Sequence, residues 1–384
     1  MNQPPLHRRR WLQLCAAASL APHASAFAQA SAKDTERPLV VAQLADMAPG
    51  QQDVSRDFLI GSRAAWQDLN ARGGVQGRPV QHLVIEVQGT GAALQAAWRS
   101  VAGNPACIAL SGCVGDAAAG ALAALQEQAP PAQPLAHVAP WMHSQEGVNA
   151  SDLVFGIFPD YQVQIAHALK TLASMGVQEL GVVYATAAVR QQSQARVRQA
   201  AQTLQLRMQD LPLPGSSAQA DQQLASPAQL IVLFVGGTPE LHGFMRRLKL
   251  QPGRQCYIVA LADVNLQVLA QMGAAKRNVS VIATQSVPLV TASLPIVRSY
   301  RDAMARLYDE PPSPQGLAGF IAARYTAEVL QSVNGPLTRA SVLAAFRRRQ
   351  DLNLGGFALA FDGRKRTHAY VTQSMLTADG RIVG

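Results

Sequence analysis

Short apolar runs alternate with amphipathic segments along almost the whole chain, and this alternation constrains the fold more than any single motif. Residues 38–45 are nearly all apolar, which is typical of a strand buried on both faces. Between Phe58 and Leu69 the apolar residues recur at helical spacing, and Gly73 can end that helix in a left-handed cap. Further strands are expected at residues 80–87, 106–110, 135–139, 153–158, 180–184, 230–235, 257–261 and 279–284. Repeated strand–helix units predict doubly wound parallel sheets with right-handed crossovers.

The pattern restarts near Asp160, so we expect two lobes of this kind. Asp160 can cap a helix that ends at Gly176, and a later helix is expected to begin with Thr238 as its N-cap and Pro239 at the first helical position. Three helices and two short strands complete the chain at residues 295–308, 315–333, 339–348, 356–361 and 368–377. A length of 384 residues also suits two lobes better than one small core. The predicted fold class is α/β, with two doubly wound lobes.

The N-terminus has the pattern of a cleavable export signal. Three arginines at positions 8–10 precede an apolar run over residues 14–20, and small residues alternate over residues 24–30. The arginines resemble those of a twin-arginine signal, although Gln13 stands where a lysine is usual. Because a spanning helix needs about 20 apolar residues, we expect cleavage of residues 1–30 rather than stable membrane insertion. The mature protein is then expected in the periplasm.

The chain is moderately basic, and the charge is spread along its length. The formal net charge of +9 falls to 9 − 3 = +6 when the three arginines of the predicted signal are removed. Two dense basic clusters, at residues 347–349 and 364–366, have no interleaved aromatic residues. In an exported protein such clusters predict solvated faces, so no nucleic-acid partner is expected.

Motifs that carry chemistry are scarce. The eight histidines show no metal-ligand spacing, and the sequence has no HExxH, CxxC or GxSxG motif. Three cysteines remain after the predicted signal, which allows at most one intramolecular disulfide and leaves a pairing of Cys107 with Cys256 open. We therefore expect no metal, no cofactor and no catalytic residues, as in a binding protein rather than an enzyme.

Four stretches are similar to one known family. Residues 70–80, NARGGVQGRPV, resemble the N-x-x-G-G-V-x-G-R-x-[IV] turn of type I periplasmic solute-binding proteins, the leucine/isoleucine/valine-binding family of ABC importers. Residues 154–161, VFGIFPDY, resemble the first crossover of that family. Residues 316–325, GLAGFIAARY, resemble its late helix, and residues 355–361 with 379–381 resemble its C-terminal hairpin. The resemblance follows the family's order over nearly the whole predicted mature chain.

The resemblance implies two lobes joined by three crossovers, with a ligand bound between the lobes. By that pattern, the N-terminal lobe combines residues 31–157 with 286–350. The other lobe combines residues 158–285 with 351–384.

The ligand site is expected where the strands of both sheets end. In doubly wound sheets, ligands bind at the carboxyl ends of the strands, where helix N-termini present free amides. This rule selects the loops at residues 111–116, 140–143, 236–238 and 262–263, and the family's ligand contacts lie on matching loops. Tyr161 joins them either as a contact near the first crossover or as an ordinary helix-start residue. The predicted ligand-binding residues are Ser111, Cys113, Gly115, Asp116, Trp141, Met142, Tyr161, Gly237, Thr238 and Asp263.

Several of these residues also have an ordinary structural explanation. Asp116 either caps its helix or lies in the pocket, where it would repel a carboxylate and favour an amide, hydroxyl or cationic group. Trp141 either stacks on a ligand or caps the core of its lobe, and His143 is expected to be a surface histidine. N-capping alone would explain Thr238. Asp263 lies near the acid that binds the ligand's ammonium group in the family's amino-acid binders.

The sequence predicts a periplasmic solute-binding protein that captures a small polar or amino-acid-like ligand and delivers it to an ABC permease. The ligand classes considered are amino acids, amides and carboxylates. The hydroxyl-rich loops of the family are replaced here, which weakens the prediction of a free branched-chain amino acid. A sensing or orphan module of the same fold, acting on a receptor, is the alternative. A secreted enzyme has support only from scattered Asp, Ser and His residues, without the spacing of a nucleophile and its base.

Overall fold

The structure is a computed structural model of the chain, and it describes residues 39–128, 134–143, 151–363, 365–366 and 370–384. The predicted export signal lies outside the described residues, and so does the beginning of the strand expected at 368–377. Among the described helices, none combines the length and the apolar character that crossing a membrane requires.

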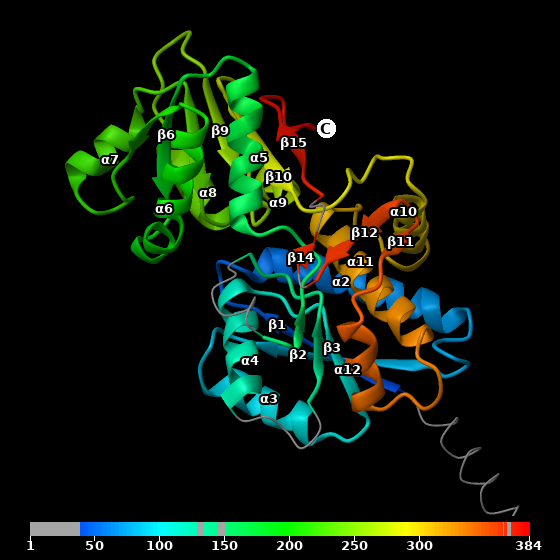
Figure 1. Cartoon of the computed structure of the whole chain (residues 1–384). Helices are drawn as coiled ribbons and strands as arrows, with labels where there is room; N and C mark the ends of the chain where they lie inside the picture. Colours follow the sequence, from blue (N-terminus) through cyan, green and yellow to red (C-terminus); the bar gives the residue numbers. More distant parts are fainter. Residues whose placement is uncertain (1–38, 129–133, 144–150, 364, 367–369) are drawn as a thin grey trace, which may run out of the picture. The chain divides into compact units, whose positions relative to one another are not determined.

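The first lobe is built on a five-stranded parallel sheet (Figure 1). All eight residues of its strand β1 are buried, which explains the continuous apolar run in the sequence. β1 pairs with β2 in a register that runs from Leu39 opposite Val80 to Asp46 opposite Val87. The spatial order is β2-β1-β3-β4-β5, with β1 (Leu39–Asp46), β2 (Val80–Val87), β3 (Cys107–Ser111), β4 (Ala136–Val138) and β5 (Val154–Phe155).

Helices cover both faces of this sheet, because successive side chains of a strand point to opposite faces. Leu39 and Val41 of β1 belong to a core that includes side chains of α2 (Gln52–Ala71), α10 (Pro295–Leu307), α11 (Pro314–Gln331) and α12 (Arg339–Arg347). Val40, Ala42 and Leu44 pack instead with α3 (Ala92–Gly103) and α4 (Asp116–Gln128).

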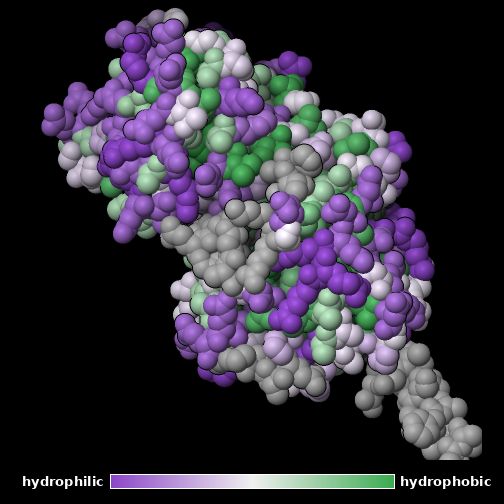
Figure 2. All heavy atoms as spheres, in the orientation of Figure 1, coloured by the Kyte–Doolittle hydropathy of each residue, from purple (hydrophilic) through white to green (hydrophobic). Residues whose placement is uncertain are grey.

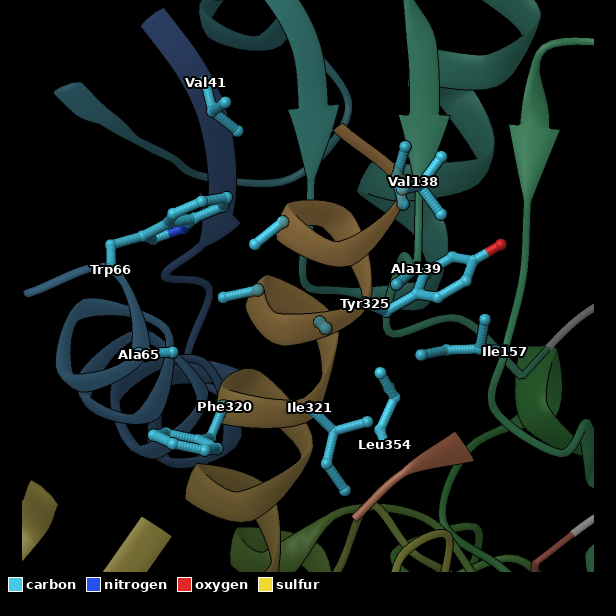
Figure 3. Close-up of a cluster of buried hydrophobic side chains, with 14 of the residues drawn as sticks. Val41, Ala65, Trp66, Val138, Ala139, Ile157, Phe320, Ile321, Tyr325 and Leu354 are labelled. Carbon is cyan, nitrogen blue, oxygen red and sulfur yellow. The ribbon is translucent and has the colours of Figure 1, made fainter. Parts of the chain in front are cut away.

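Helices α2 and α11 approach closely because glycines lie where they meet. A β-carbon on Gly61 of α2 would lie 1.7 Å from the carbonyl oxygen of Gly316. One on Gly319 of α11 would lie 1.9 Å from the carbonyl oxygen of Phe58, and Ser62 Oγ donates to the carbonyl of Gly319 at 3.2 Å. Figure 3 shows α11 with its apolar side chains directed toward α2 on one side and toward β4 and the segment after β5 on the other. Segments from both halves of the sequence therefore share one core.

The second lobe contains a seven-stranded sheet in the order β16-β15-β10-β9-β8-β6-β7. Its central strands are parallel, and β15 runs antiparallel to both β10 and β16. The strands are β6 (Glu179–Tyr184), β7 (Arg207–Asp210), β8 (Ile231–Val235), β9 (Cys256–Ala260), β10 (Val279–Gln285), β15 (Thr372–Leu376) and β16 (Ile382–Val383).

Helices cover both faces of the second sheet as well. One face packs against α5 (Tyr161–Ser174) and α6 (Ala187–Thr203), and the other against α7 (Ala218–Ala225), α8 (Thr238–Arg247) and α9 (Leu266–Gln271). Asp160 caps α5 as predicted, since its side chain accepts a hydrogen bond from the backbone N–H of Val163. In the view of Figure 2, hydrophilic side chains gather over α6 and α7, whose buried residues point into the lobe.

A C-terminal hairpin packs on the first lobe. The hairpin consists of β11 (Leu352–Leu354) and β12 (Phe357–Leu359), and its apolar side chains lie in the core beneath α11 and α12. Its turn requires glycine at Gly355, which has φ +61° and lies so close to α10 that a β-carbon would be 2.9 Å from Ile296 N. Residues 351–384 were expected in the second lobe, so the chain leaves the first lobe later than expected. β13 (Phe361–Asp362) and β14 (Lys365–Arg366) follow before the chain reaches β15.

The predicted α/β class with two doubly wound lobes is confirmed. Strands β7, β11, β14 and β16 and helices α7 and α9 were not predicted. The sequence of β7 is Arg-Met-Gln-Asp, at the edge of its sheet, and such a strand has no apolar run that would reveal it. Cys107, Cys113 and Cys256 are buried and free, and Cys107 and Cys256 lie in different sheets.

Candidate ligand-binding site

Loops at the carboxyl ends of the two sheets meet, and hydrogen bonds join them directly. Trp141 Nε1, in the loop after β4, donates to Asp263 Oδ1, in the loop after β9, at 3.3 Å. Asn265 Nδ2, from the same second-lobe loop, donates to Asp57 Oδ2 of α2 at 2.8 Å. The rule that ligands bind at strand carboxyl ends therefore selected loops that the fold brings together.

Two glutamines add hydrogen bonds between the lobes. Gln315 Nε2, at the start of α11, donates to the carbonyl oxygen of Ala262 at 3.1 Å. Gln267 Nε2 of α9 donates to the carbonyl oxygen of Pro312 at 2.7 Å. Gln315 is buried and Gln267 is half-buried, so the contact between the lobes includes a water-excluded part and a more exposed part.

Asp263 is the centre of the buried part. The residue is only 5% exposed, and its carboxylate is surrounded by polar groups of the chain itself. Trp141 Nε1 and His143 Nε2 lie 3.3 and 3.4 Å from Oδ1, and the Tyr161 hydroxyl donates to Oδ2. Two of these side chains come from the loop after β4 in the first lobe, and Tyr161 is the first residue of α5 in the second.

His143 is buried, so the expectation of a surface histidine was wrong. Its loop is held inward by two backbone hydrogen bonds: His143 N donates to Asp116 Oδ1 at 2.6 Å, and Tyr161 N donates to the carbonyl of His143 at 3.0 Å. On the ring, Nδ1 lies 3.1 Å from the carbonyl oxygen of Pro159 and 3.0 Å from Gln164 Nε2. Sequence alone could not show this, because the loop turns inward through contacts with residues 27 and 18 positions away.

The electrostatics of the site favour a charged histidine beside a charged aspartate. Burial by itself would lower the pKa of His143, but the carboxylates of Asp263 and Asp116 outweigh it and raise that pKa above its ordinary 6.5. Burial would raise the pKa of Asp263, but the His143 charge and the hydrogen bonds from His143, Tyr161 and Trp141 lower it below 3.8. Burial, together with both carboxylates, raises the pKa of Tyr161, so this hydroxyl remains a donor.

Trp141 belongs to the core of the first lobe as well as to the contact with Asp263. Its ring is 2% exposed and packs 5.7 Å from the ring of Phe58 and 5.1 Å from that of Phe158. The indole therefore caps the core, and its N–H points out of that core toward the second lobe.

Thr238 contributes to the second connection between the lobes, but not as a helix cap. The N-cap of α8 is Gly237, and Thr238 Oγ1 accepts a hydrogen bond from the backbone N of Asn265 at 2.9 Å. The predicted N-cap was thus one residue late. Asn265 in turn caps α9 with its Oδ1 and bonds Asp57 with its Nδ2. Burial, with a smaller effect of Glu310, raises the pKa of Asp57 above its ordinary 3.8.

The sequence matches a family model described as periplasmic binding protein over residues 38–380. The chain belongs to the periplasmic binding protein family. Its members are solute-binding proteins and receptors, and the resemblance seen in the sequence is confirmed at this level. Among curated proteins, none matches the sequence.

Solved structures share the fold of this periplasmic binding protein. An extracellular ligand-binding receptor from Verminephrobacter eiseniae is 18% identical, with 91% of this chain and 100% of that chain covered and a TM-score of 0.80. A possible leucine/isoleucine/valine-binding protein from Rhodopirellula baltica is 18% identical, with 91% and 97% covered and a TM-score of 0.76. A fatty acid ABC transporter substrate-binding protein from Thermomonospora curvata is 17% identical, with 90% and 91% covered and a TM-score of 0.72. At these identities the likeness concerns the fold.

The structure divides the predicted ligand-binding residues of this binding protein into two groups. Asp116, Trp141, Tyr161 and Asp263 form one connected cluster, and Gly237 and Thr238 lie at the second connection between the lobes. Gly237 approaches the first lobe closely: a β-carbon there would lie 2.9 Å from the carbonyl oxygen of Gly50.

The other predicted residues point into the first lobe. Ser111 Oγ lies 2.7 Å from Thr326 Oγ1 of α11. Cys113 packs in the core on the α3 and α4 face, and Met142 packs against residues of α4. Gly115 lies against Asp46, whose β-carbon would be 2.6 Å from a β-carbon at Gly115.

His143, Asn265, Asp57 and Gln164 also join these contacts and were not predicted. Gln164 is fully buried, and its Oε1 accepts a hydrogen bond from Ala262 N at 3.0 Å, beside the loop that carries Asp263. The one available signal was spacing: Gln164 lies three positions after Tyr161, on the same face of a helix.

Proposed function

We propose that this protein captures a small polar solute between its lobes and presents it to the permease of an ABC importer. The observation that carries the proposal is the direct meeting of strand-end loops from both sheets, centred on Asp263, in a chain of the periplasmic binding protein family. A solute that bonds both loops binds the closed arrangement better than the open one and shifts the population toward closure. The permease then recognises the closed arrangement.

The charges at these loops support a solute that offers hydrogen-bond donors. Asp57, Asp116 and Asp263 place three carboxylates where the loops meet. When the lobes open, Asp57 and Asp263 lose the partners that the other lobe supplies, and an amide, a hydroxyl or an amino group of a solute can take their place, whereas a carboxylate would be repelled. The similar structures named above include a possible leucine/isoleucine/valine-binding protein and a fatty acid transport protein, so the fold by itself does not fix the solute.

A sensing role is the second candidate. Asp263 is bonded by donors of this chain from both lobes, so the lobes have a contact of their own besides any that a solute would provide. Such a protein could signal to a receptor through its closed form, and a similar structure is described as an extracellular ligand-binding receptor. Binding of the closed form to the membrane subunits of an importer, measured in detergent, separates transport from sensing.

A thermal-shift screen tests solute capture. The panel holds amino acids, short amides, polyamines, sugars and aliphatic carboxylates, each added to the protein purified from the periplasm. A solute at 100 times its Kd stabilises the folded protein by about 2.7 kcal/mol, which raises the melting temperature by several degrees. The Asp57→Asn variant should lose part of the shift, and exposed Gln95→Ala should keep all of it. A panel without any shift would contradict solute capture.

We also propose that the chain is exported and cleaved near residue 30. The support is the N-terminal signal pattern together with membership of a periplasmic family. Mass spectrometry of the protein from the periplasmic fraction should give an N-terminus near residue 30. An intact N-terminus on a cytoplasmic protein would contradict export.

A further inference from the structure

We propose that Trp141, His143, Tyr161 and Asp263 form a latch that holds the two lobes together without a solute and that tightens on acidification. The latch is the set of these four side chains. Its action goes beyond solute capture and does not depend on it, because every group that makes the latch belongs to the chain itself.

The latch joins loops of both lobes. Trp141 and His143 follow β4 of the first lobe, whereas Asp263 follows β9 of the second. Tyr161 and the Pro159 carbonyl that contacts His143 lie where the chain first crosses between the lobes. The latch therefore lies next to a connection that must bend when the lobes separate, and separation of the two sheets must part Asp263 from the indole N–H.

The charged side chains of the latch are buried. The side chain of His143 is 0% exposed and that of Asp263 is 6% exposed, so their interaction takes place away from water. A buried charge is tolerated only when it is paired and hydrogen-bonded: Asp263 accepts hydrogen bonds from Trp141 and Tyr161, and its Oδ1 lies 3.4 Å from His143 Nε2, at ion-pair distance. Opening exchanges the Trp141 and His143 partners of Asp263 for water, whereas Tyr161 lies in the same lobe as Asp263 and keeps its hydrogen bond.

Carboxylates lie on both sides of the contact around His143 and act on its charge. The ionisable groups that face it are Asp263 from the loop after β9, Asp116 from the start of α4, and Tyr161 from the start of α5. The remaining polar neighbours, the Gln164 amide and the Pro159 carbonyl, carry no charge. Both acids stabilise the histidine cation, and only Asp263 moves away when the lobes part.

The direction of the pH effect follows from these charges. In the closed form the pKa of His143 is raised above 6.5, so closure takes up a proton and is favoured below that value. The contribution is lost as the pH rises through the closed-form pKa of His143. The pKa of Asp263 is lowered in the closed form, so its contribution is present above 3.8 and is lost only in stronger acid. The latch is therefore tightest in mild acid, below the open-form pKa of His143 and above the open-form pKa of Asp263.

Neutral His143 weakens the latch without breaking it. The tautomer that carries its proton on Nε2 can still face Asp263, while Nδ1 accepts from Gln164 Nε2. What is lost is the charge, so a graded shift between open and closed forms is expected.

Single-molecule fluorescence energy transfer tests the latch without any solute, in the chain from residue 31 onward, which lacks Cys15. Dyes are attached to Ser100→Cys on α3 and Gln202→Cys on α6, two exposed positions in different lobes. The native cysteines do not compete, because burial raises the pKa of Cys107, Cys113 and Cys256 to about 11, 12 and 11. The measured quantity is the ratio of closed to open molecules between pH 5.5 and pH 8.0.

In the unaltered chain this ratio should fall at least about threefold over that range, since each unit of difference in the His143 pKa between forms is worth a factor of ten. His143→Gln should reduce the slope, and Asp263→Asn should lower the ratio at every pH. His167→Gln, which removes a partly exposed histidine on α5, should keep the full slope. Burial also raises the pKa of Asp53 and Asp57 near the second connection, so the difference in slope between the unaltered chain and His143→Gln, and not the slope of either alone, measures the contribution of His143.

A ratio that does not change with pH would overturn the proposal, and so would equal slopes in the unaltered chain and in His143→Gln. If Asp263→Asn closes as well as the unaltered chain, the four side chains do not hold the lobes. None of these outcomes depends on whether a solute is captured. The failure of the latch and the failure of the proposed function are therefore distinguishable.

Discussion

The contact between α2 and α11 and the contact between the two lobes both join segments far apart in the sequence, but by different physics. In the first, glycine lets two helix backbones touch, and the surrounding side chains are apolar. In the second, the contacts are hydrogen bonds around carboxylates. Apolar burial has no substitute in water, whereas each of these polar groups can exchange its partner for water at a net cost of about 1 kcal/mol. The first contact is therefore permanent, and the second can open.

The largest effect is expected from Gly61→Ala. The new methyl group would lie 1.7 Å from the carbonyl oxygen of Gly316, so the two helices must move apart. We expect the free energy of unfolding to fall by about 3 kcal/mol or more in urea denaturation. Gly243→Ala is the control: it lies in α8 with open space around it and should raise stability by about 0.5 kcal/mol. Equal effects of the two changes would contradict the close-contact explanation.

Asp263→Ala should have the next largest effect. It removes the acceptor shared by Trp141, His143 and Tyr161. A loss of about 2 kcal/mol is expected in the same measurement, less than for a pair that cannot reach water, because the lobes can open and hydrate His143. A variant as stable as the unaltered protein at pH 6 would show that these donors contribute nothing to folding.

Trp141→Phe should lower the free energy of unfolding less than Asp263→Ala. The ring contacts with Phe58 and Phe158 are retained, and only the indole N–H that reaches Asp263 is lost. We expect a loss of about 1 kcal/mol and a smaller closed fraction by energy transfer. Trp98→Phe removes a buried indole N–H within the first lobe and should leave the closed fraction unchanged. If both variants change closure alike, the Trp141 bond is not specific to the lobe contact.

Gln267→Ala should have the smallest effect. Its side chain donates to the Pro312 carbonyl from a half-buried position, where water can take its place. A loss of about 0.5 kcal/mol is expected by denaturation, with Gln95→Ala as an exposed control of no effect. A loss as large as that for Asp263→Ala would mean that the exposed part of the contact is as strong as the buried part.

Much of the fold could be predicted because the central strands are buried on both faces. The strand expected at 38–45 is β1, 39–46, and that expected at 257–261 is β9, 256–260. Continuous apolar runs are visible without any knowledge of neighbours. The edge strand β7 and the short helices α7 and α9 lack such runs. Their place depends on the elements beside them, which only the folded chain supplies.

The sequence predicted which loops come together better than it predicted which residues of those loops make the contacts. Trp141, Tyr161 and Asp263 do meet, but Ser111, Cys113 and Met142 point into the first lobe. From the sequence, a small loop residue that lines a binding site cannot be distinguished from one that packs in the hydrophobic core. His143 was misjudged for the same reason, since its burial depends on Asp116 and Tyr161 holding the loop inward.

By itself, the sequence determined the α/β class, the two lobes and which strand-end loops lie together. These follow from local periodicity and from the rule that parallel strands end at one edge of a sheet. Only the tertiary structure decided that the C-terminal hairpin packs on the first lobe, that glycines bring α2 and α11 together, and that Asp263 is bonded from both lobes. Those features depend on where individual side chains point and how deeply they are buried. Both are set by contacts between residues far apart in the sequence.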